Sequence, residues 1–191
     1  MVLAVPVVLG LAVGLVLGGS PARLGRLRLR AIPLVYLALA LQLVAFPVRD
    51  GLWNTPDRLA IGLWLASYCC LGVAIVANIA APGMPLLAGG VAANLAAILA
   101  NGGHMPALPR ALDGAGLGYR LHYNSVAAAT PHLSFLVDRW AAPAWIPLAN
   151  VYSVGDVLIA LGAFVLALTA TGARRLPTRG RSRGRKHLIG H

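Results

Sequence analysis

Five apolar stretches constrain the fold of this chain more than any other feature. They cover Val2–Leu17, Ile32–Pro47, Leu59–Ile79, Pro85–Ala100 and Val157–Leu168. A helix that crosses a bilayer needs roughly 20 mostly apolar residues, and with their flanking small residues the stretches approach that length. The chain is 59% hydrophobic and only 11% charged, which is too apolar for a water-soluble protein. The sequence predicts an all-α, polytopic protein of the cell membrane with about five transmembrane helices.

The distribution of charge predicts the orientation of these helices. One basic cluster follows the first stretch and comprises Arg23, Arg26, Arg28 and Arg30. A second lies in the tail at 174–191, which contains no acidic residue. Because cytoplasmic loops are enriched in Lys and Arg, we expect the N-terminus outside and the C-terminus in the cytoplasm. All five acidic residues are Asp and fall on the predicted outer side.

The same pattern predicts one membrane domain, residues 1–173, with an outer loop over 101–155. We expect short re-entrant or surface-lying helices in that loop. The basic tail, 174–191, is expected to be disordered and to bind anionic lipid headgroups through its charge. The net charge of +11 does not indicate nucleic-acid binding, because the basic residues flank apolar stretches and lack interleaved aromatic residues for base stacking.

Two sets of small or polar residues lie within the apolar stretches. Gly10, Gly14 and Gly18 recur every four residues, so they share a helical face that allows a neighbouring backbone to approach closely. The amides are Gln42, Asn78 and Asn94. Hydrogen bonding between helices is the commonest use of such amides, and a ligand or ion path is the alternative.

The motif NGGHMP, residues 101–106, follows the fourth apolar stretch. Its two glycines and its proline predict the end of a helix, with Asn101 and His104 as polar groups near the interface. A supporting role at a site is the alternative for both side chains. Together with His122 and His132, His104 matches no compact metal-binding motif, and no cofactor-binding motif is present. The sequence therefore predicts neither a metal nor a cofactor.

Two aspartates form the strongest candidate site. Asp138 follows a short apolar stretch, and Asp156 lies at the start of the last predicted helix, three residues after Ser153. One reading is a helix cap, because a carboxylate in the first turn and a serine before it both satisfy helix N–H groups. The other reading is catalytic: two neighbouring carboxyl groups cannot both ionise cheaply, so one holds a proton while the other activates water.

The motifs NGGHMP and YSVGDVLIALG resemble those of an uncharacterised bacterial family of multi-pass membrane proteins, and this resemblance implies no activity. More distantly, 137–168 resembles the end of signal peptidase II, a membrane aspartic peptidase. That resemblance implies a catalytic dyad of Asp138 and Asp156 on the outer side, with Asn124 as the preceding polar residue. Ser153 stands where that family's motif has Asn.

Three functions remain open from the sequence. The first is a non-catalytic accessory subunit of a larger membrane complex, because the residues resembling the peptidase are incomplete and the first helix has a glycine face. The second is a membrane aspartic hydrolase that acts at the outer leaflet through Asp138 and Asp156. The third is a small transporter or lipid binder that uses the intramembrane amides. The expected partners are membrane lipids and, for the first function, other membrane subunits.

Overall fold

The computed structural model describes residues 4–46, 55–117, 125–142 and 150–173. Within them lie the five predicted apolar helices, α1 (Ala4–Val16), α2 (Ile32–Ala45), α3 (Asp57–Ala77), α4 (Met84–Ala100) and α6 (Val154–Ala170). A short 3-10 helix, η1 (Pro21–Arg26), follows α1. In the described part of the chain, α3 is the one helix that is long and apolar enough to cross a membrane by itself. The five helices are thus confirmed, whereas their membrane topology stays a prediction. The basic tail lies outside the described residues.

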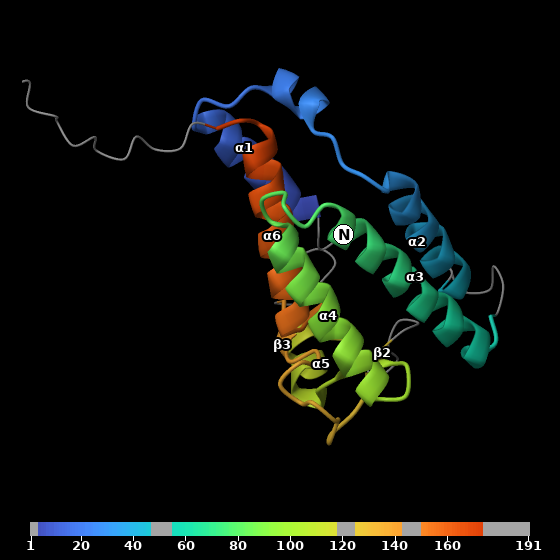
Figure 1. The fold of residues 1–191 in the computed structure, drawn as a ribbon. Helices are drawn as coiled ribbons and strands as arrows, with labels where there is room; N and C mark the ends of the chain where they lie inside the picture. Colours follow the sequence, from blue (N-terminus) through green and yellow to red (C-terminus); the bar gives the residue numbers. More distant parts are fainter. Residues whose placement is uncertain (1–3, 47–54, 118–124, 143–149, 174–191) are drawn as a thin grey trace, which may run out of the picture.

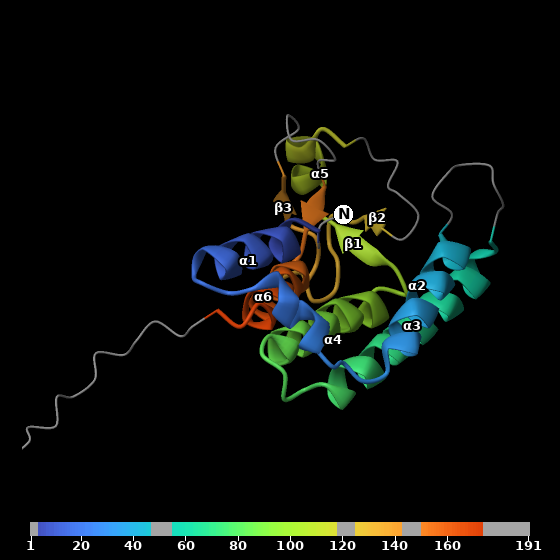
Figure 2. The ribbon, with the colours of Figure 1, turned by 90° about the horizontal axis from the view of Figure 1, so that it is seen from above.

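The helices follow one another in space in an order that differs from the sequence. The last helix, α6, lies between α1 and α4, while α4 contacts α3 and α3 pairs with α2 (Figures 1 and 2). Neighbours α4 and α6 are antiparallel, since Gly83 meets Gly162 and Gly90 meets Gly155. Helix α1 runs parallel to α6. The arginine-rich segment with η1 therefore lies at one end of the bundle, where the Arg23 guanidinium donates to the Gly172 carbonyl at 2.8 Å.

Glycines allow α6 to pack closely on both sides. A Cβ added at Gly10 would lie 2.5 Å from the Phe164 carbonyl oxygen, and one at Gly14 would collide with Thr171. The predicted close packing of this glycine face is therefore confirmed for Gly10 and Gly14, and the partner is α6 of the same chain. Gly18 lies beyond the helix, and a Cβ there would meet nothing within 4 Å.

The segment after α4 contains a short helix, as the sequence predicts, and short strands that it does not predict. It contains one short helix, α5 (Pro109–Ala115), and four strands, β1 (Met105–Ala107), β2 (Ser125–Ala127), β3 (Trp140–Ala141) and β4 (Val151–Tyr152). Strands β1 and β2 are parallel, with Met105 opposite Ser125, and β3 and β4 are antiparallel, with Trp140 opposite Tyr152. Strands of two or three residues are too short to show an alternating pattern. The described fold is mostly helical, as the sequence predicts, with these short strands added after α4.

The amides of the apolar stretches join distant segments, as one of their two predicted uses requires. Gln42 on α2 donates to the Ser67 hydroxyl on α3 at 3.0 Å. Asn78, which follows α3, donates to the Arg30 carbonyl at 2.8 Å and accepts from the Arg30 N–H at 2.7 Å. The Gln42 bond joins the two helices directly, and the Asn78 bonds join the segments at the open end of the α2–α3 hairpin. The third amide, Asn94, belongs to the candidate site.

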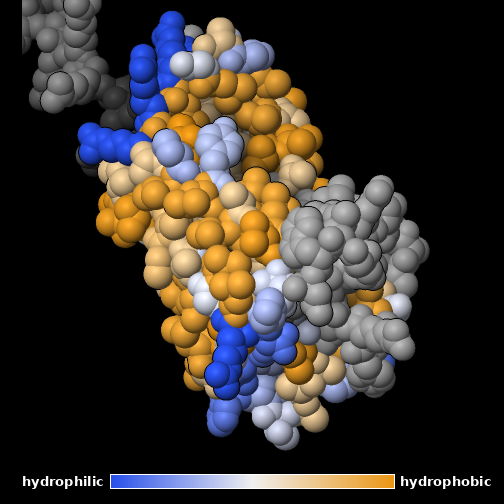
Figure 3. All heavy atoms as spheres, turned by 90° about the vertical axis from the view of Figure 1, so that its right-hand side faces the viewer, coloured by the Kyte–Doolittle hydropathy of each residue, from blue (hydrophilic) through white to orange (hydrophobic). Residues whose placement is uncertain are grey.

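The surface carries a broad apolar band. Figure 3 shows hydrophobic atoms across the middle of the molecule and hydrophilic atoms at both ends. Large side chains on several helices are more than half exposed, among them Val8, Tyr36, Val76 and Leu99. Soluble monomers rarely expose so much contiguous apolar surface. The apolar helices and this surface favour a membrane protein.

Candidate functional site

Asp156 occupies the first turn of α6 and takes part in the cap that the sequence predicts. Ser153 is the N-cap residue, and its hydroxyl accepts a hydrogen bond from the Asp156 N–H at 3.1 Å. In return, Asp156 Oδ2 accepts from the Ser153 N–H at 3.0 Å. This reciprocal pair is a capping box. The predicted cap is confirmed, and it uses one of the two carboxylate oxygens of Asp156.

The other oxygen of Asp156 faces α4. Asn94 Nδ2 donates to Asp156 Oδ1 at 2.9 Å, and Asn94 Oδ1 accepts from the Ser153 hydroxyl at 2.8 Å. The three side chains thus form a closed network in which Asn94 and Ser153 are buried. Gly155 makes this possible, because a Cβ there would collide with the Asn94 side chain. The network fixes the Asp156 carboxylate and satisfies every member.

Asp138 reaches the same end of the bundle through the strands. Its N–H donates to the Pro106 carbonyl at 3.0 Å, and its carbonyl accepts from the Leu108 N–H at 2.9 Å, so it bridges to β1. The backbone N–H of the next residue, Arg139, donates to the carbonyl of Tyr152, just before α6, at 3.0 Å. Asp138 is therefore held between β1 and the segment that leads into Asp156. Its side chain is 6% exposed.

The negative charge of Asp156 acts on the carboxyl group of Asp138. Burial raises the pKa of Asp138 from 3.8 to about 8, and the negative charge of Asp156 adds to the increase. Burial disfavours a carboxylate, and a second negative charge nearby disfavours it further. At neutral pH Asp138 therefore holds its proton for most of the time. The two predicted aspartates thus lie within electrostatic range of each other, with a proton on Asp138 and hydrogen-bond donors on Asp156.

The remaining predicted residues lie apart from this network. Asn101 closes α4: its Nδ2 donates to the carbonyls of Ala97 at 2.7 Å and His132 at 2.9 Å, and its Oδ1 accepts from the His132 N–H at 2.9 Å. His104 precedes β1 and makes no hydrogen bond with Asp156 or its partners Asn94 and Ser153. Asn124 lies outside the described residues. Within the described ranges, no group of three or more His, Cys, Asp or Glu could hold a metal ion.

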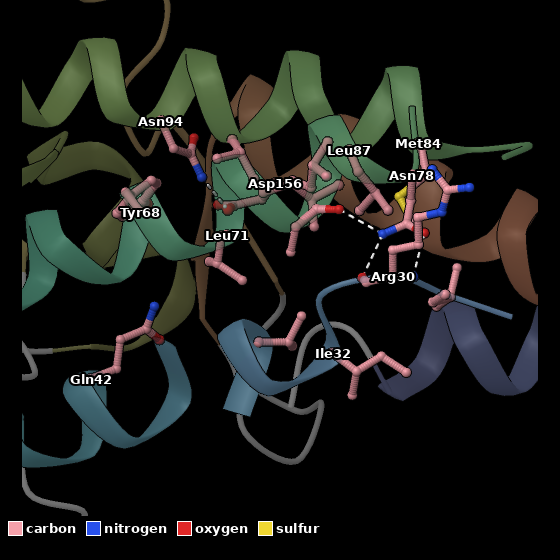
Figure 4. A pocket seen from close by; sticks show the side chains of 16 residues that line it. Arg30, Ile32, Gln42, Tyr68, Leu71, Asn78, Met84, Leu87, Asn94 and Asp156 are labelled. Carbon is pink, nitrogen blue, oxygen red and sulfur yellow. Dashed lines mark hydrogen bonds between the residues drawn. The ribbon is translucent and has the colours of Figure 1, made fainter. Parts of the chain in front are cut away.

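A cavity of about 440 Å³ opens beside Asp156, between the α2–α3 hairpin and the α4–α6 pair. Figure 4 shows Asn94, Tyr68 and Asp156 together, away from Arg30 and Asn78 at the other end.

Tyr68 is a cavity residue that the sequence did not single out, because one tyrosine in an apolar stretch is usually a packing residue. Its ring does pack in this way, with its centroid 6.0 Å from that of Trp64. Asn94 did carry a signal as an amide in an apolar stretch, although its partner was not predictable.

The comparisons with known proteins identify a family. Neither the curated proteins nor the solved structures gave a match. A family of unknown function, DUF5317, matches residues 26–168, a range that holds α2 to α5, all but the last two residues of α6, and both candidate aspartates. The predicted resemblance to an uncharacterised family is confirmed, and the resemblance to signal peptidase II stays a prediction. This chain belongs to the DUF5317 family.

Proposed function

We propose that this protein is a polytopic membrane hydrolase in which Asp138 and Asp156 act as a pair at the outer face of the membrane. One observation carries the proposal: burial raises the pKa of Asp138 to about 8, and the negative charge of Asp156 adds to the increase. Pairs of carboxyl groups with different affinities for a proton are typical of general acid–base catalysis. Capping requires neither Asp138 nor the amide of Asn94.

The chemistry follows from the protonation of the pair. Asp156 accepts a proton from a water molecule, whose oxygen then attacks the carbonyl carbon of an amide or ester. Asp138 gives its proton to the carbonyl oxygen, which leaves a tetrahedral diol between the two side chains. When the bond to the leaving group breaks, the proton on Asp156 passes to the leaving nitrogen or oxygen, and Asp138 recovers its proton from the diol. Both carboxyl groups return to their starting states.

The membrane topology is part of the same proposal. The arginine-rich segment and the end of α6 lie at one end of the bundle, and the two aspartates lie at the other. Under the positive-inside rule, the arginine end faces the cytoplasm and the aspartates face outward. Helices α1, α3 and α6 then cross inward, and α2 and α4 cross outward. A substrate would reach the pair from the outer leaflet or from the space beyond it.

The accessory-subunit hypothesis remains a prediction with less support. It rested in part on the glycine face of α1, and that face is occupied by α6 of the same chain at Gly10 and Gly14. A partner subunit would have to bind elsewhere on the apolar surface. Helices α2 and α3 expose several large apolar side chains, such as Tyr36 and Val73, and lipid can cover these as well.

A comparison of protein termini tests the proposed hydrolysis. We would express the full chain and the variants Asp138→Asn and Asp156→Asn in the same cells, and compare the terminal peptides of all membrane proteins by mass spectrometry. Loss of either carboxyl group should remove the same set of cleaved termini, because both groups are needed. Asp113→Asn is the matched control, since Asp113 is an exposed aspartate on α5, and it should leave the set intact.

The outcome decides between the hypotheses if the variants are present in equal amounts. Blotting of the membrane fraction checks this, and a parallel lipid extract detects hydrolysed esters. A set of termini or lipid products that depends on both Asp138 and Asp156 supports the hydrolase. Identical termini and identical lipids in the wild type and in both variants would contradict it and would favour an accessory subunit.

A further inference from the structure

The cavity beside Asp156 has an apolar body and ends of opposite charge. Leu71, Leu87, Val91 and Ile159 line its walls, and Asp156 with Asn94 lies at one end. Arg30 lies at the other end, next to Asn78 and Met84 (Figure 4). From Met84 to Asn94 along α4 the cavity extends roughly 15 Å, at 1.5 Å per residue. Its volume of about 440 Å³ is in the range of ligand pockets.

Arg30 is fixed at the rim by its main chain while its side chain is exposed. Asn78 accepts from the Arg30 N–H and donates to the Arg30 carbonyl, at 2.7 and 2.8 Å. This pair of hydrogen bonds holds the backbone of Arg30 at the cavity end, because two directed contacts fix its orientation. Arg23, Arg26 and Arg28 are also exposed on this segment, but of these four arginines only Arg30 lines the cavity.

We infer that the cavity binds one acyl chain of an anionic phospholipid, with the lipid phosphate on Arg30 at the cytoplasmic side. The apolar walls suit a hydrocarbon chain, because the chain keeps apolar neighbours when it moves from the bilayer into the cavity. The phosphate selects the arginine end, since basic residues at the membrane surface attract anionic lipids. At the opposite end, the carboxylate of Asp156 is already satisfied by Asn94 and Ser153 and would repel a phosphate.

Native mass spectrometry of the detergent-purified full chain tests this inference. The probes are phosphatidylglycerol and phosphatidylcholine with identical acyl chains, titrated separately. We expect the wild type to retain one phosphatidylglycerol at about fivefold lower lipid concentration than phosphatidylcholine, the factor that one basic residue supplies at a membrane surface. Arg30→Gln should abolish this preference. Arg28→Gln is the matched control, because Arg28 lies in the same cluster and does not line the cavity, and it should keep the preference.

A second pair of variants tests the acyl chain separately from the headgroup. Val91→Trp fills the cavity and should weaken retention of both lipids at least fivefold, whereas Val73→Trp, on an exposed position of α3, should not. Equal retention of the two lipids by the wild type would overturn the inference, and so would equal losses from Arg30→Gln and Arg28→Gln. The lipid site does not depend on the proposed hydrolysis: Asp138→Asn should abolish hydrolysis and leave lipid retention unchanged.

Discussion

The two oxygens of the Asp156 carboxylate accept hydrogen bonds from different partners. Oδ2 belongs to the helix cap with Ser153, and Oδ1 accepts from Asn94 on another helix. Replacing Asn94 by Leu should lower the free energy of unfolding by about 1–3 kcal/mol, because the buried Ser153 hydroxyl and Asp156 both lose a partner. Unfolding in a denaturing detergent measures this change.

Asn78→Leu is the matched control for that substitution. Asn78 also joins distant segments by hydrogen bonds, but at the arginine end, so its loss should also destabilise the fold. Only Asn94→Leu should shift the carboxyl carbon signal of Asp156 in a nuclear magnetic resonance spectrum. An equal shift in both variants would mean that Asn94 does not hold this carboxylate specifically.

Stability should depend on pH through Asp138. Its pKa is about 8 in the folded protein and 3.8 in the reference state, so the folded state binds more protons between these values. The contribution of Asp138 to the free energy of unfolding is therefore fully present below about pH 4 and is lost as the pH rises toward 8. The slope is at most about 1.4 kcal/mol per pH unit for one proton. Unfolding midpoints of the wild type measured across this range should show the fall. Asp138→Asn should remove this slope, and the exposed Asp113→Asn should retain it.

Local relations at the site were predictable from the sequence and distant ones were not. The spacing of Ser153 and Asp156 predicts the cap, because a capping box is a contact within one turn. The partner of Asn94 lies 62 positions away, and no pattern within α4 indicates it. The same holds for Asp138: its electrostatic interaction with Asp156 depends on β3 pairing with β4 and on a bridge to Ala107. Pairings this short leave no pattern in the sequence.

At the scale of elements, the contact between α4 and α6 places the site. A Cβ at Gly90 would lie 2.5 Å from the Gly155 carbonyl oxygen, so Gly90→Ala should push the helices apart. We expect a loss of about 1–3 kcal/mol in the free energy of unfolding, as for other overpacked cores. Gly62→Ala is the control, because a Cβ at Gly62 on α3 would meet nothing within 4 Å, and Ala is the better helix former. A stable Gly90→Ala variant would contradict the close packing.

The five helices were predictable because each rests on a long local pattern, whereas the strands after α4 were not. Helix α4 illustrates the first case: its apolar stretch ends at Asn101, where Gly102 and Gly103 adopt positive φ angles of 70° and 92°. Met105 on β1 illustrates the case of the strands, since it pairs with Ser125 on β2, which lies outside its own local stretch of sequence. Tertiary pairing, and not local propensity, forms strands of this length.

At the scale of the whole molecule, the account predicts a fixed orientation in the membrane. The native Cys69 and Cys70 would be replaced by Ala, and one new cysteine introduced at Asp113 on α5 or at Arg26 on η1, both exposed positions. A maleimide that cannot cross membranes should label the Asp113→Cys variant in intact cells. It should label the Arg26→Cys variant only after the membrane is opened. The reverse pattern would place the aspartate pair in the cytoplasm and contradict the proposed topology.

The central claim is that Asp138 and Asp156 form one coupled pair, and the chain is well suited to a direct measurement. Its five acidic residues are all Asp, so selective ¹³C labelling of aspartate carboxyl groups gives few signals to follow in a pH titration by nuclear magnetic resonance. The account predicts that Asp138 titrates near pH 8 and that Asp156→Asn lowers this midpoint, because the neighbouring negative charge is removed. A midpoint for Asp138 near pH 4 that Asp156→Asn leaves unchanged would contradict the account.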